Sequence, residues 1–391
     1  MRICLDLRYK TESGGSTYVK QLTENLLRCD RENEYILLKY KKQSFRFEHL
    51  ASEVLFSPRL PNALELIWTV CVLPFVLARN RIDVHHGMKS PVPFFSTVPT
   101  VTTMHSTHDN YKGEYYTRLP MKLYFKFYGN RLFPRVSAII AVSHFLKECL
   151  IEHHGVESKK IHVIAHGVGE SFRSMNLDEI LPILTRYGIT RQYMLCIGNV
   201  TVVKNHITVV KAFNEIKEQT QADLVIAGAT EHPNSQYAEI LSTVEQLRIQ
   251  DRVRFLGFVS TDDLAALLNG ALLLAFPSLH EGFGLAMLEA FKCGVPIIAS
   301  PVAPVAELGR GRVLLMNDPR DYNELASLLL RVLSSETLRR ELRAKSLAAA
   351  ESYSWERSAR AHIEVYRNCF LESRYLKDFS DRAEASNTPG I

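Results

Sequence analysis

The chain has 391 residues, more than one ordinary hydrophobic core needs, so two domains of similar size are expected. Its composition, with 46% hydrophobic, 23% charged and 9% aromatic residues, is that of a globular protein and excludes a largely disordered chain. The formal charge of +5 suits an anionic ligand or surface. The basic residues form no stripe and no binding motif, however, which argues against nucleic acid as a partner.

Cysteine usage and the N-terminus favour a cytoplasmic protein. The seven cysteines are odd in number and include no C-x-x-C pair, as expected of free thiols in a reducing compartment. Met1 leads directly into a strand-like run with no signal peptide ahead of it. The longest apolar stretch, residues 63–78, contains Glu65 and Pro74 and is shorter than the roughly 20 residues that cross a bilayer. We therefore expect a helix buried under a sheet there.

The first half of the chain alternates strand-like and helix-like segments. Residues 2–7 predict a strand, Gly14-Gly15 interrupts the chain, and residues 16–27 predict a helix. Another helix is expected at residues 144–153. Further strands are expected at residues 35–39, 54–56, 84–86, 98–104, 137–142 and 161–164.

The second half repeats this pattern more clearly. Strands are expected at residues 193–197, 224–227, 253–255, 271–276, 295–299 and 313–316. Helices are expected between them at residues 207–218, 237–248, 262–268 and 284–293, and after them at residues 321–333, 336–351 and 355–369. Such alternation predicts an α/β protein with two doubly wound domains, each a parallel sheet with helices on both faces.

The expected domain limits lie where the strand signals lapse. The first domain is predicted to span residues 1–172 and the second residues 190–354. The polar end of the chain, residues 375–391, carries Pro389-Gly390 and is expected to be disordered. Since ligands of doubly wound sheets bind at the carboxyl ends of strands, functional residues are expected just after strands.

The ten residues HEGFGLAMLE, numbered 280–289, follow such a strand and lead into a helix. The two glycines let the backbone approach a ligand, and the free N–H groups of the first helical turn suit a phosphate. A carboxylate beside a phosphate would be repelled by it, so Glu281 is expected to accept hydrogen bonds from sugar hydroxyls. Glu289, more than a turn further on, is expected to reach ribose hydroxyls. A glutamate at a helix start can also be only a partner of the helix dipole, but the whole string is more specific.

This string resembles the E-x7-E signature of the retaining glycosyltransferases of family 4, which have the GT-B fold. The resemblance covers nearly the whole chain, because other landmarks of the family occur in order around the string. They are matched by residues 13–16, Asp83-Val84-His85, His105, residues 141–143, residues 166–168, Gly198-Asn199 through Lys204-Asn205, and Ser354-Trp355-Glu356 with Tyr366. The resemblance implies two Rossmann-like domains facing across a cleft, with a C-terminal helix at about residues 355–374 crossing back to the first domain.

The resemblance also implies roles for single residues. Lys204 would neutralise the donor diphosphate as the leaving group departs, and Glu281 and His105 would bind sugar hydroxyls, which makes these three the catalytic candidates. Glu289 would bind the ribose. The remaining donor-binding candidates are Gly14, Gly15, Gly198, Asn199, Asn205, Gly282, Phe283, Gly284 and Leu285. Such sites require no metal or cofactor, and the sequence has no convincing D-x-D motif.

Two positions depart from the family pattern. Many members carry arginines where this chain has Val203 and Asn199, beside the lysine and the glycine of the same loop. The diphosphate would then lose up to two charge-assisted contacts. Either Lys204 and the helix N-termini suffice, or another cation such as Arg8 or Lys89 takes part.

The fourteen histidines do not predict a metal site. Adjacent side chains such as His85 and His86 point to opposite faces of a strand and cannot easily share a metal. The pair His153-His154 lies at an expected helix C-terminus, where imidazoles are favoured in any case.

Residues 118–135 carry five basic residues, no acid and many aromatics. They either contact anionic lipid or a lipid-linked acceptor, or form a helix whose aromatics pack inward. The preceding loop at residues 106–117, rich in Tyr and His, is the better candidate for acceptor contacts.

These features predict a retaining hexosyltransferase of polysaccharide or lipopolysaccharide biosynthesis, in the cytoplasm or peripheral on the inner face of the membrane. GDP-mannose is favoured as the donor, with a UDP-hexose as the second candidate, and a glycan or lipid-linked saccharide is the expected acceptor. Two rival hypotheses stay open: an epimerase or phosphorylase of the same fold, and a non-catalytic nucleotide-sugar-binding relative. A nicotinamide-dependent oxidoreductase is excluded, because no strand is followed by G-x-G-x-x-G.

Overall fold

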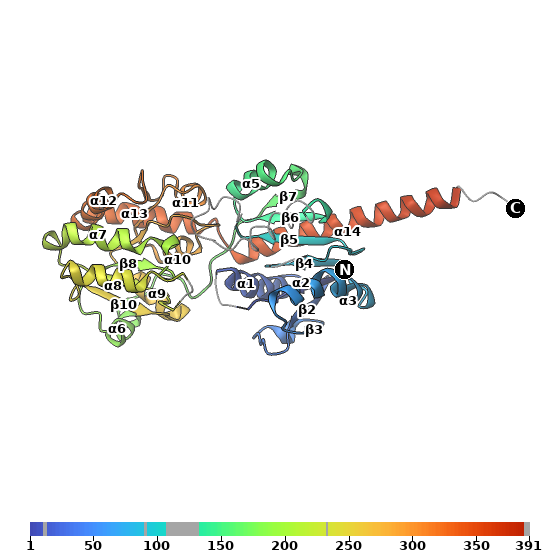
Figure 1. Ribbon diagram of the computed structural model, residues 1–391, viewed down its shortest axis with the longest axis horizontal. Helices are drawn as coiled ribbons and strands as arrows, with labels where there is room; N and C mark the ends of the chain where they lie inside the picture. The colour runs from blue at the N-terminus through green and yellow to red at the C-terminus, as the bar shows by residue number, and fades with distance from the viewer. Residues whose placement is uncertain (11–13, 90–91, 107–132, 232–233, 387–391) are drawn as a thin grey trace. The chain divides into compact units, whose positions relative to one another are not determined.

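The structure is a computed structural model of the chain and describes residues 1–10, 14–89, 92–106, 133–231 and 234–386. Its contacts divide the chain into unit 1, which combines Met1–His166 with Trp355–Ile391, and unit 2, Gly167–Ser354. Each unit is built on one parallel β-sheet with helices packed against it (Figure 1). The predicted fold class, two doubly wound Rossmann-like units, is therefore confirmed.

The sheet of unit 1 has the strand order β3-β2-β1-β4-β5-β6-β7, and all neighbouring strands are parallel. Its strands are β1 (Arg2–Asp6), β2 (Glu34–Tyr40), β3 (Glu53–Ser57), β4 (Val84–Gly87), β5 (Thr100–Met104), β6 (Ala138–Ala141) and β7 (Ile161–Val163). Each overlaps a strand that the sequence predicts, because a strand covered on both faces is recognisable as an apolar run.

Helices cover both faces of this sheet. On one face, α1 (Gly14–Cys29) packs along α14 (Trp355–Ser386), which also contacts β4. On the other face lie α2 (Asn62–Ile67), the π-helical turn η2 (Trp68–Val72) and α3 (Leu73–Arg79), whose Leu73 and Leu77 join a buried cluster with Cys4. The remaining helical segments of the described part of unit 1 are α5 (His144–His154) and the short turns η1 (Glu48–Leu50), η4 (Phe133–Arg135) and η5 (Ser158–Lys160).

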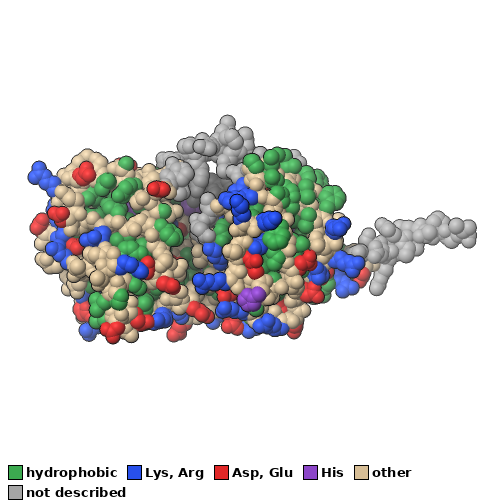
Figure 2. Space-filling view, turned by 90° about the horizontal axis from the view of Figure 1, so that it is seen from below, with side chains coloured by type: hydrophobic (Ala, Val, Ile, Leu, Met, Phe, Trp, Pro, Cys, Tyr) green, Lys and Arg blue, Asp and Glu red, His purple; other side chains and the backbone are tan. Residues whose placement is uncertain are grey.

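The apolar stretch at residues 63–78 corrects one expectation. It forms three consecutive helical segments of which only one side is buried, while the side chains of Leu64, Ile67 and Phe75 are more than half exposed. Pro74 has no backbone N–H, but it lies in the first turn of α3, where the N–H groups have no partner within the helix. The π-helical turn η2 directly before α3 accommodates the resulting break in the helical hydrogen-bond pattern. Hydrophobic side chains gather on the surface of unit 1 beside Lys and Arg (Figure 2). None of the helices within the described ranges is long and apolar enough to cross a membrane.

The sheet of unit 2 has the order β10-β9-β8-β11-β12-β13, again fully parallel. Its strands are β8 (Tyr193–Ile197), β9 (Asp223–Ala227), β10 (Val253–Gly257), β11 (Leu273–Phe276), β12 (Ile297–Ala299) and β13 (Leu314–Leu315). The helical segments are α6 (Leu177–Arg186), η6 (Val202–Lys204), α7 (His206–Ile216), η7 (Lys217–Gln219), α8 (Tyr237–Gln246), α9 (Thr261–Gly270), α10 (Leu285–Cys293), α11 (Ala303–Gly309), α12 (Tyr322–Ser334) and α13 (Glu336–Ala350). The core between them is apolar and includes Phe213 from α7 and Leu329 from α12.

Helix α6 occupies the segment that the sequence treats as the boundary between domains. It begins with a capping box, in which the Asn176 side chain accepts from the Glu179 N–H and the Glu179 carboxylate accepts from the Asn176 N–H, both at 3.0 Å. The helix packs against α9, so this segment belongs to unit 2. The structure changes unit at His166, ahead of the expected limit at residue 172.

Helix α14 is longer than expected. It belongs to unit 1, as the returning C-terminal helix should, but it runs to Ser386 instead of ending near residue 374. The expectation of disorder from residue 375 onward is therefore wrong as far as Ser386, and residues 387–391 lie outside the described part. The sequence has no glycine or proline between Trp355 and Ser386, so nothing in it terminates the helix before Pro389.

Candidate active site

The E-x7-E segment of unit 2 lies where the sequence places it, between β11 and α10. Gly284 is the residue before the first turn of α10 and has φ +103°, a conformation that favours glycine. The Phe283 side chain is buried and packs edge-on against Tyr353 at 6.4 Å, so Phe283 can offer a ligand its backbone but not its ring. The segment therefore presents backbone N–H groups and the first helical turn at the end of β11.

The second loop of the site, residues 198–205, follows β8. Gly198 has φ +126°, and a Cβ there would come within 3.1 Å of the Lys204 side chain, which crosses directly over it. Asn199 is exposed. The two loops are linked by a hydrogen bond of 2.8 Å from the Leu279 N–H to the Val203 carbonyl. The strands β8 and β11 are neighbours at the point where the strand order reverses, which is where doubly wound sheets bind ligands.

Asn205 holds this loop in place through hydrogen bonds of its side chain. It is buried and has φ +58°, and its Nδ2 donates to the carbonyl oxygens of Pro277 at 3.1 Å and Pro319 at 2.6 Å. Its Oδ1 accepts from the Thr208 hydroxyl at 2.8 Å. The Asn205 amide predicted to bind the donor is thus committed to protein groups, and its structural contribution is to fix the loop beside Lys204.

Lys204 and Glu281 meet although 77 positions separate them in the sequence. The Lys204 Nζ lies 2.5 Å from Glu281 Oε1, and both side chains are partly exposed. Lys204 also lies 5.5 Å from the ring centre of Phe276 at the end of β11. A cation and a hydrogen-bond acceptor thus converge beside the glycine backbone of both loops. This is the combination that a sugar attached to a diphosphate requires.

Glu289 lies apart from this pair, on α10. It makes no hydrogen bond or ion pair with another described residue, and burial raises the pKa of its carboxyl to about 8. A carboxyl in this state is available to a hydroxyl-bearing ligand.

In unit 1, His105 follows β5, as predicted. Its Nε2 donates to the Met88 carbonyl at 2.9 Å, and its ring contacts the Tyr18 ring edge-on at 4.6 Å. Burial lowers the pKa of His105 to about 4, so the imidazole is neutral at neutral pH. With the proton on Nε2, Nδ1 is an acceptor, and it has no partner among the described residues.

Gly14 and Gly15 open α1 in the same unit. The Lys89 side chain passes over Gly15 so closely that a Cβ there would lie 2.8 Å from Lys89 Cε. The Lys89 amine also lies 5.6 Å from the ring centre of Tyr9. The glycine pair therefore accommodates a lysine at the start of α1.

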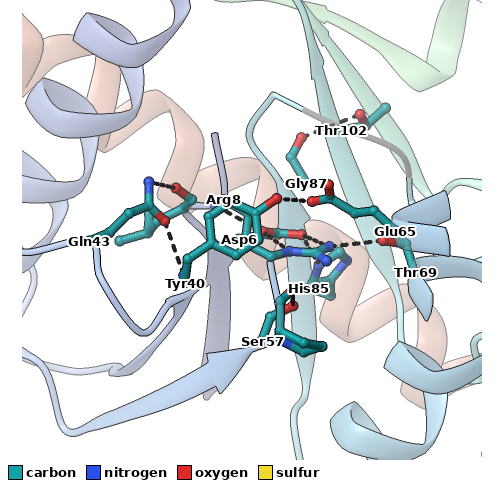
Figure 3. A network of polar contacts seen from close by, with 12 residues as sticks. Asp6, Arg8, Tyr40, Gln43, Ser57, Glu65, Thr69, His85, Gly87 and Thr102 are labelled. Atoms are coloured by element: carbon teal, nitrogen blue, oxygen red, sulfur yellow. Dashed lines mark hydrogen bonds and ion pairs between the residues drawn. The ribbon is translucent and has the colours of Figure 1, made fainter. Parts of the chain in front are cut away.

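Arg8 does not supply the missing cation. It is buried, and its Nε and Nη2 donate to the two carboxylate oxygens of Asp6 at 2.8 and 2.6 Å (Figure 3). Nη2 also donates to the Thr69 hydroxyl at 3.1 Å, and the guanidinium lies 4.7 Å from the Trp68 ring centre. The charge of Arg8 is already compensated within unit 1. Sequence reasoning does not predict this network, because its only signal is an Asp and an Arg at the end of a buried strand.

No group of three or more His, Cys, Asp or Glu side chains that could hold a metal occurs within the described ranges. His85 and His86 face opposite sides of the sheet, as predicted. His85 faces Asp6, with 4.0 Å between Nε2 and Oδ2, and His86 faces the Tyr366 hydroxyl on α14. The acceptor loop at residues 106–117 and the basic segment at residues 118–135 lie outside the described residues, apart from the few at their ends.

Curated relatives and solved structures resemble this chain. It is 29% identical over 254 residues to the serotype-specific mannosyltransferase WbdA of Escherichia coli, covering 64% of this chain but only 31% of that protein. It is 28% identical to the O-antigen chain mannosyltransferase B of Escherichia coli, covering 59% and 60% of the two chains. The structures of a glycosyltransferase from Rickettsia africae ESF-5 and of Anabaena Alr3699/HepE each superpose with a TM-score of 0.75 at 17% identity. They match 94% of this chain and 98% and 100% of their own, which shows the GT-B fold.

Family models account for both units. Residues 13–172 match the model described as Glycosyltransferase Family 4, and residues 187–348 match the model described as Glycosyl transferases group 1. Together the two matches take in most of the chain and include all the candidate residues of both units. The chain therefore belongs to the group 1 glycosyl transferases of glycosyltransferase family 4.

Proposed function

We propose that this protein is a retaining hexosyltransferase that moves a hexose from a nucleotide diphosphate sugar to a glycan or lipid-linked saccharide. The observation that carries the proposal is the convergence of Lys204 and Glu281 at the ends of β8 and β11, beside two glycine-containing loops. A cation there matches the diphosphate, and a carboxylate matches sugar hydroxyls. Family membership and the mannosyltransferase names of the relatives give independent support.

Each residue has a distinct part in the proposed chemistry. When the bond between the sugar and the diphosphate breaks, negative charge grows on the leaving phosphate, and the Lys204 ammonium stabilises it. The backbone N–H groups at Gly282 and Gly284 bind the sugar or its phosphate, and Glu281 orients the sugar hydroxyls. Glu289 accepts from the ribose. The Nδ1 atom of neutral His105, which has no hydrogen-bond partner among the described residues, accepts a hydrogen bond from a sugar hydroxyl.

The proposed reaction uses no metal, because Lys204 and the N-terminus of α10 supply the positive charge. Transfer activity in the presence of a chelator is the direct test. We expect chelation to leave the rate within about twofold, since the charge is held by the chain itself. A rate that collapses with chelator and returns with Mg²⁺ would contradict this part of the proposal.

The favoured donor is GDP-mannose, on the strength of the relatives' names, with a UDP-hexose as the second candidate. Val203 and Asn199 leave the diphosphate with fewer cationic contacts than many family members provide. Thermal stabilisation and slow donor hydrolysis across GDP- and UDP-sugars, with NAD as the control, test the donor class. Stabilisation by one nucleotide class but not by NAD supports the proposal. Binding without hydrolysis or transfer to any saccharide would favour a non-catalytic relative, and no binding at millimolar concentration would refute the proposal.

Retention is tested by the product. The anomeric proton of the transferred sugar, observed by NMR during the first turnovers, should have the same configuration as in the donor. An inverted product would show that the mechanism, although not the enzyme class, is wrong.

We also propose that the protein associates peripherally with an anionic membrane surface. One candidate for this contact is the basic segment at residues 118–135, most of which lies outside the described part. The outer side of α2 to α3 offers a described surface of suitable character, since Leu64 and Phe75 are exposed and Arg79 is exposed at its end. The one acid of this stretch, Glu65, is paired within unit 1.

Co-sedimentation with phosphatidylglycerol vesicles distinguishes the two surfaces. Phe75→Asp should reduce binding if α2 to α3 makes the contact, whereas the paired change Lys122→Glu and Lys126→Glu should reduce it if the basic segment does. Leu181→Asp, at an exposed apolar position of unit 2, is the matched control. Wild-type protein that stays in the supernatant with these vesicles would refute the association.

A further inference from the structure

A continuous chain of buried hydrogen bonds crosses unit 1 on the face of the sheet that α1 and α14 cover. Its five links join four elements that are far apart in the sequence. They run from the Ser358 carbonyl to His362 Nδ1 (2.7 Å), from His362 Nε2 to the Tyr18 hydroxyl (2.9 Å), on to the Thr103 hydroxyl (2.7 Å), on to His86 Nε2 (2.8 Å), and from His86 Nδ1 to the Tyr366 hydroxyl (2.6 Å). The chain begins and ends on α14, so α14 is tied to α1, β5 and β4 by one closed path.

The direction of every bond follows from the first one. A carbonyl only accepts, so His362 Nδ1 carries a proton, and because the buried ring is neutral its Nε2 must accept from the Tyr18 hydroxyl. Tyr18 has then used its only proton and accepts from Thr103.

The same reasoning fixes the other half of the chain. Thr103 has given its proton to Tyr18, so it accepts from His86 Nε2, which must be protonated. The neutral His86 ring then accepts at Nδ1 from the Tyr366 hydroxyl. Every group along the path has a single role, and no different arrangement of protons satisfies all five bonds while both histidines are neutral.

Tyr18, at the centre of this chain, also contacts His105. Its ring meets the His105 ring edge-on at 4.6 Å and lies 5.0 Å from His166 and 6.0 Å from Trp355. His166 and Trp355 are the residues at which unit 1 ends and resumes, and their rings lie 5.5 Å from each other. One tyrosine therefore touches the candidate active-site histidine and both places where the chain passes between the units.

We propose that Tyr18 is a positioning residue for His105, held by a hydrogen-bond chain with one proton arrangement in which His362 is protonated on Nδ1 and His86 on Nε2. The hydroxyl fixes where the Tyr18 ring sits, and the ring fixes the plane of His105 while the Met88 carbonyl fixes its Nε2 proton. The lone pair of His105 Nδ1 is thereby aimed in one direction. The effect on transfer rests on the proposed function, but the proton arrangement does not.

The proton arrangement is tested on the unmodified protein. Long-range ¹H–¹⁵N NMR spectra of the full chain labelled with ¹⁵N-histidine distinguish the two neutral tautomers and the charged ring. At neutral pH we expect His362 with its proton on Nδ1 and His86 and His105 with theirs on Nε2. A charged His362, or a neutral His362 with its proton on Nε2, would contradict the proposed proton arrangement.

The positioning role is tested by two matched variants. Tyr18→Phe keeps the ring beside His105 but removes the hydroxyl at the centre of the chain. Tyr366→Phe removes the hydroxyl at its end, and its ring contacts are with His86 and His362. We expect Tyr18→Phe to lower kcat about tenfold with the donor KM within about twofold, and Tyr366→Phe to leave kcat of the folded enzyme within about twofold.

Two kinetic outcomes would overturn the positioning role: equal losses of kcat in both variants, which would indicate a structural effect, or no loss in either. Should the wild type transfer sugar from no nucleotide sugar at all, the proposed function fails, and the NMR result still decides the proton arrangement. If transfer is normal but His362 has the other tautomer, this inference alone fails.

Discussion

Units 1 and 2 share one architecture, a parallel sheet covered by helices, but they fill its interior differently. Unit 1 buries charged and titratable groups, among them the Asp6–Arg8 pair and the histidines His86 and His362. In unit 2 no Asp, Glu, Lys or Arg within the described ranges is fully buried, and the core is apolar. Two of the charged groups of unit 2 that matter for the proposed function, Lys204 and Glu281, lie instead on loops at the sheet edge, and the third, Glu289, is half-buried on α10.

The two units are stabilised by different kinds of interaction. A buried polar group costs free energy unless it is hydrogen-bonded, so unit 1 depends on hydrogen-bond networks such as the five-link chain through Tyr18. Unit 2 is stabilised by apolar burial, which leaves its edge loops free to exchange their internal ion pair for a ligand. Substitutions of buried polar residues in unit 1 should therefore lower the free energy of unfolding. Substitutions in the edge loops of unit 2 should lower the transfer activity and leave the stability nearly unchanged.

The largest effect is expected from breaking the buried pair in unit 1. Arg8→Leu leaves Asp6 as an uncompensated buried charge and should lower the free energy of unfolding by about 3–5 kcal/mol. Urea unfolding measures it, with Arg340→Ala, at an exposed ion pair of unit 2, as a control expected to change by less than about 1 kcal/mol. The double change Asp6→Leu with Arg8→Leu should regain much of the loss. A loss below about 1 kcal/mol in Arg8→Leu would show that the pair is not important to unit 1.

The next effect concerns the edge of unit 2. Lys204→Ala removes the cation proposed to stabilise the leaving diphosphate and should lower kcat by about 10²–10³-fold while leaving the unfolding free energy nearly unchanged. Lys292→Ala, an exposed lysine of α10, is the matched control and should retain full activity. Transfer assays and urea unfolding on the same preparations are the measurement. A Lys204→Ala variant that keeps its kcat would remove Lys204 from the mechanism.

Lowering the pH should destabilise unit 1 before it destabilises unit 2. Among the described residues, burial lowers the histidine pKa at six positions of unit 1: to about 4 for His85, His105 and His362, further for His86 and His166, and also below the usual value for His162. In the described part of unit 2 it does so at one position, His206, whose pKa falls to about 3. A histidine whose pKa is lower in the folded protein than in the unfolded chain, where it is about 6.5, stabilises the folded state above pH 6.5. This contribution to the free energy of unfolding is lost as the pH falls toward the pKa of the folded protein. Each such histidine withdraws up to about 1.4 kcal/mol per pH unit in that window.

Limited proteolysis mapped by mass spectrometry follows this loss along the chain. As pH falls from neutral toward about 5, cleavage should rise in unit 1 before unit 2. Earlier cleavage in unit 2 would contradict the contrast between the two interiors.

The smallest effect concerns Glu289. Because its pKa is raised by folding, its contribution to stability depends on pH in the opposite direction from that of the histidines. The contribution is present below about pH 4.5 and is lost as the pH rises toward about 8. If the ionised carboxylate binds the ribose, donor affinity should increase by up to about tenfold between neutral pH and pH 9, because only about a tenth of the carboxyl is ionised at pH 7. Calorimetric titration of the donor measures this, and Glu289→Gln should flatten the profile. An equal pH dependence in both proteins would assign the titration to another group.

Much of the fold could be predicted because buried parallel strands are continuous apolar runs. Every strand of the described sheets overlaps a predicted segment, and β8 has the predicted bounds. Helix α6 is not among the predicted helices although its capping box, Asn176 with Glu179, is present in the sequence, because a lapse of strand signals is also typical of a linker. The predicted α14 is too short, because the polar composition of its end is also typical of a disordered tail, whereas the absence of glycine and proline favours a continuous helix.

The site was predictable only in part, for a physical reason. Residues that follow neighbouring parallel strands meet at one edge, so the placement of Lys204 and Glu281 at strand ends followed from their position in the sequence. Their contact, the hydrogen bonds of the Asn205 side chain, the pairing of Arg8 with Asp6 and the chain through Tyr18 depend on side chains brought together from distant segments. No local pattern encodes such contacts.

Hydrogen exchange of the full chain, with and without a nucleotide diphosphate sugar, shows whether the two edge loops of unit 2 bind the donor. If unit 2 binds the donor at its edge loops, amide protection should increase at residues 198–205 and 279–289 with the preferred GDP- or UDP-sugar and not with NAD, and Lys204→Ala should reduce the increase. Unchanged exchange in both loops with every nucleotide sugar, or equal protection by NAD, would contradict the account.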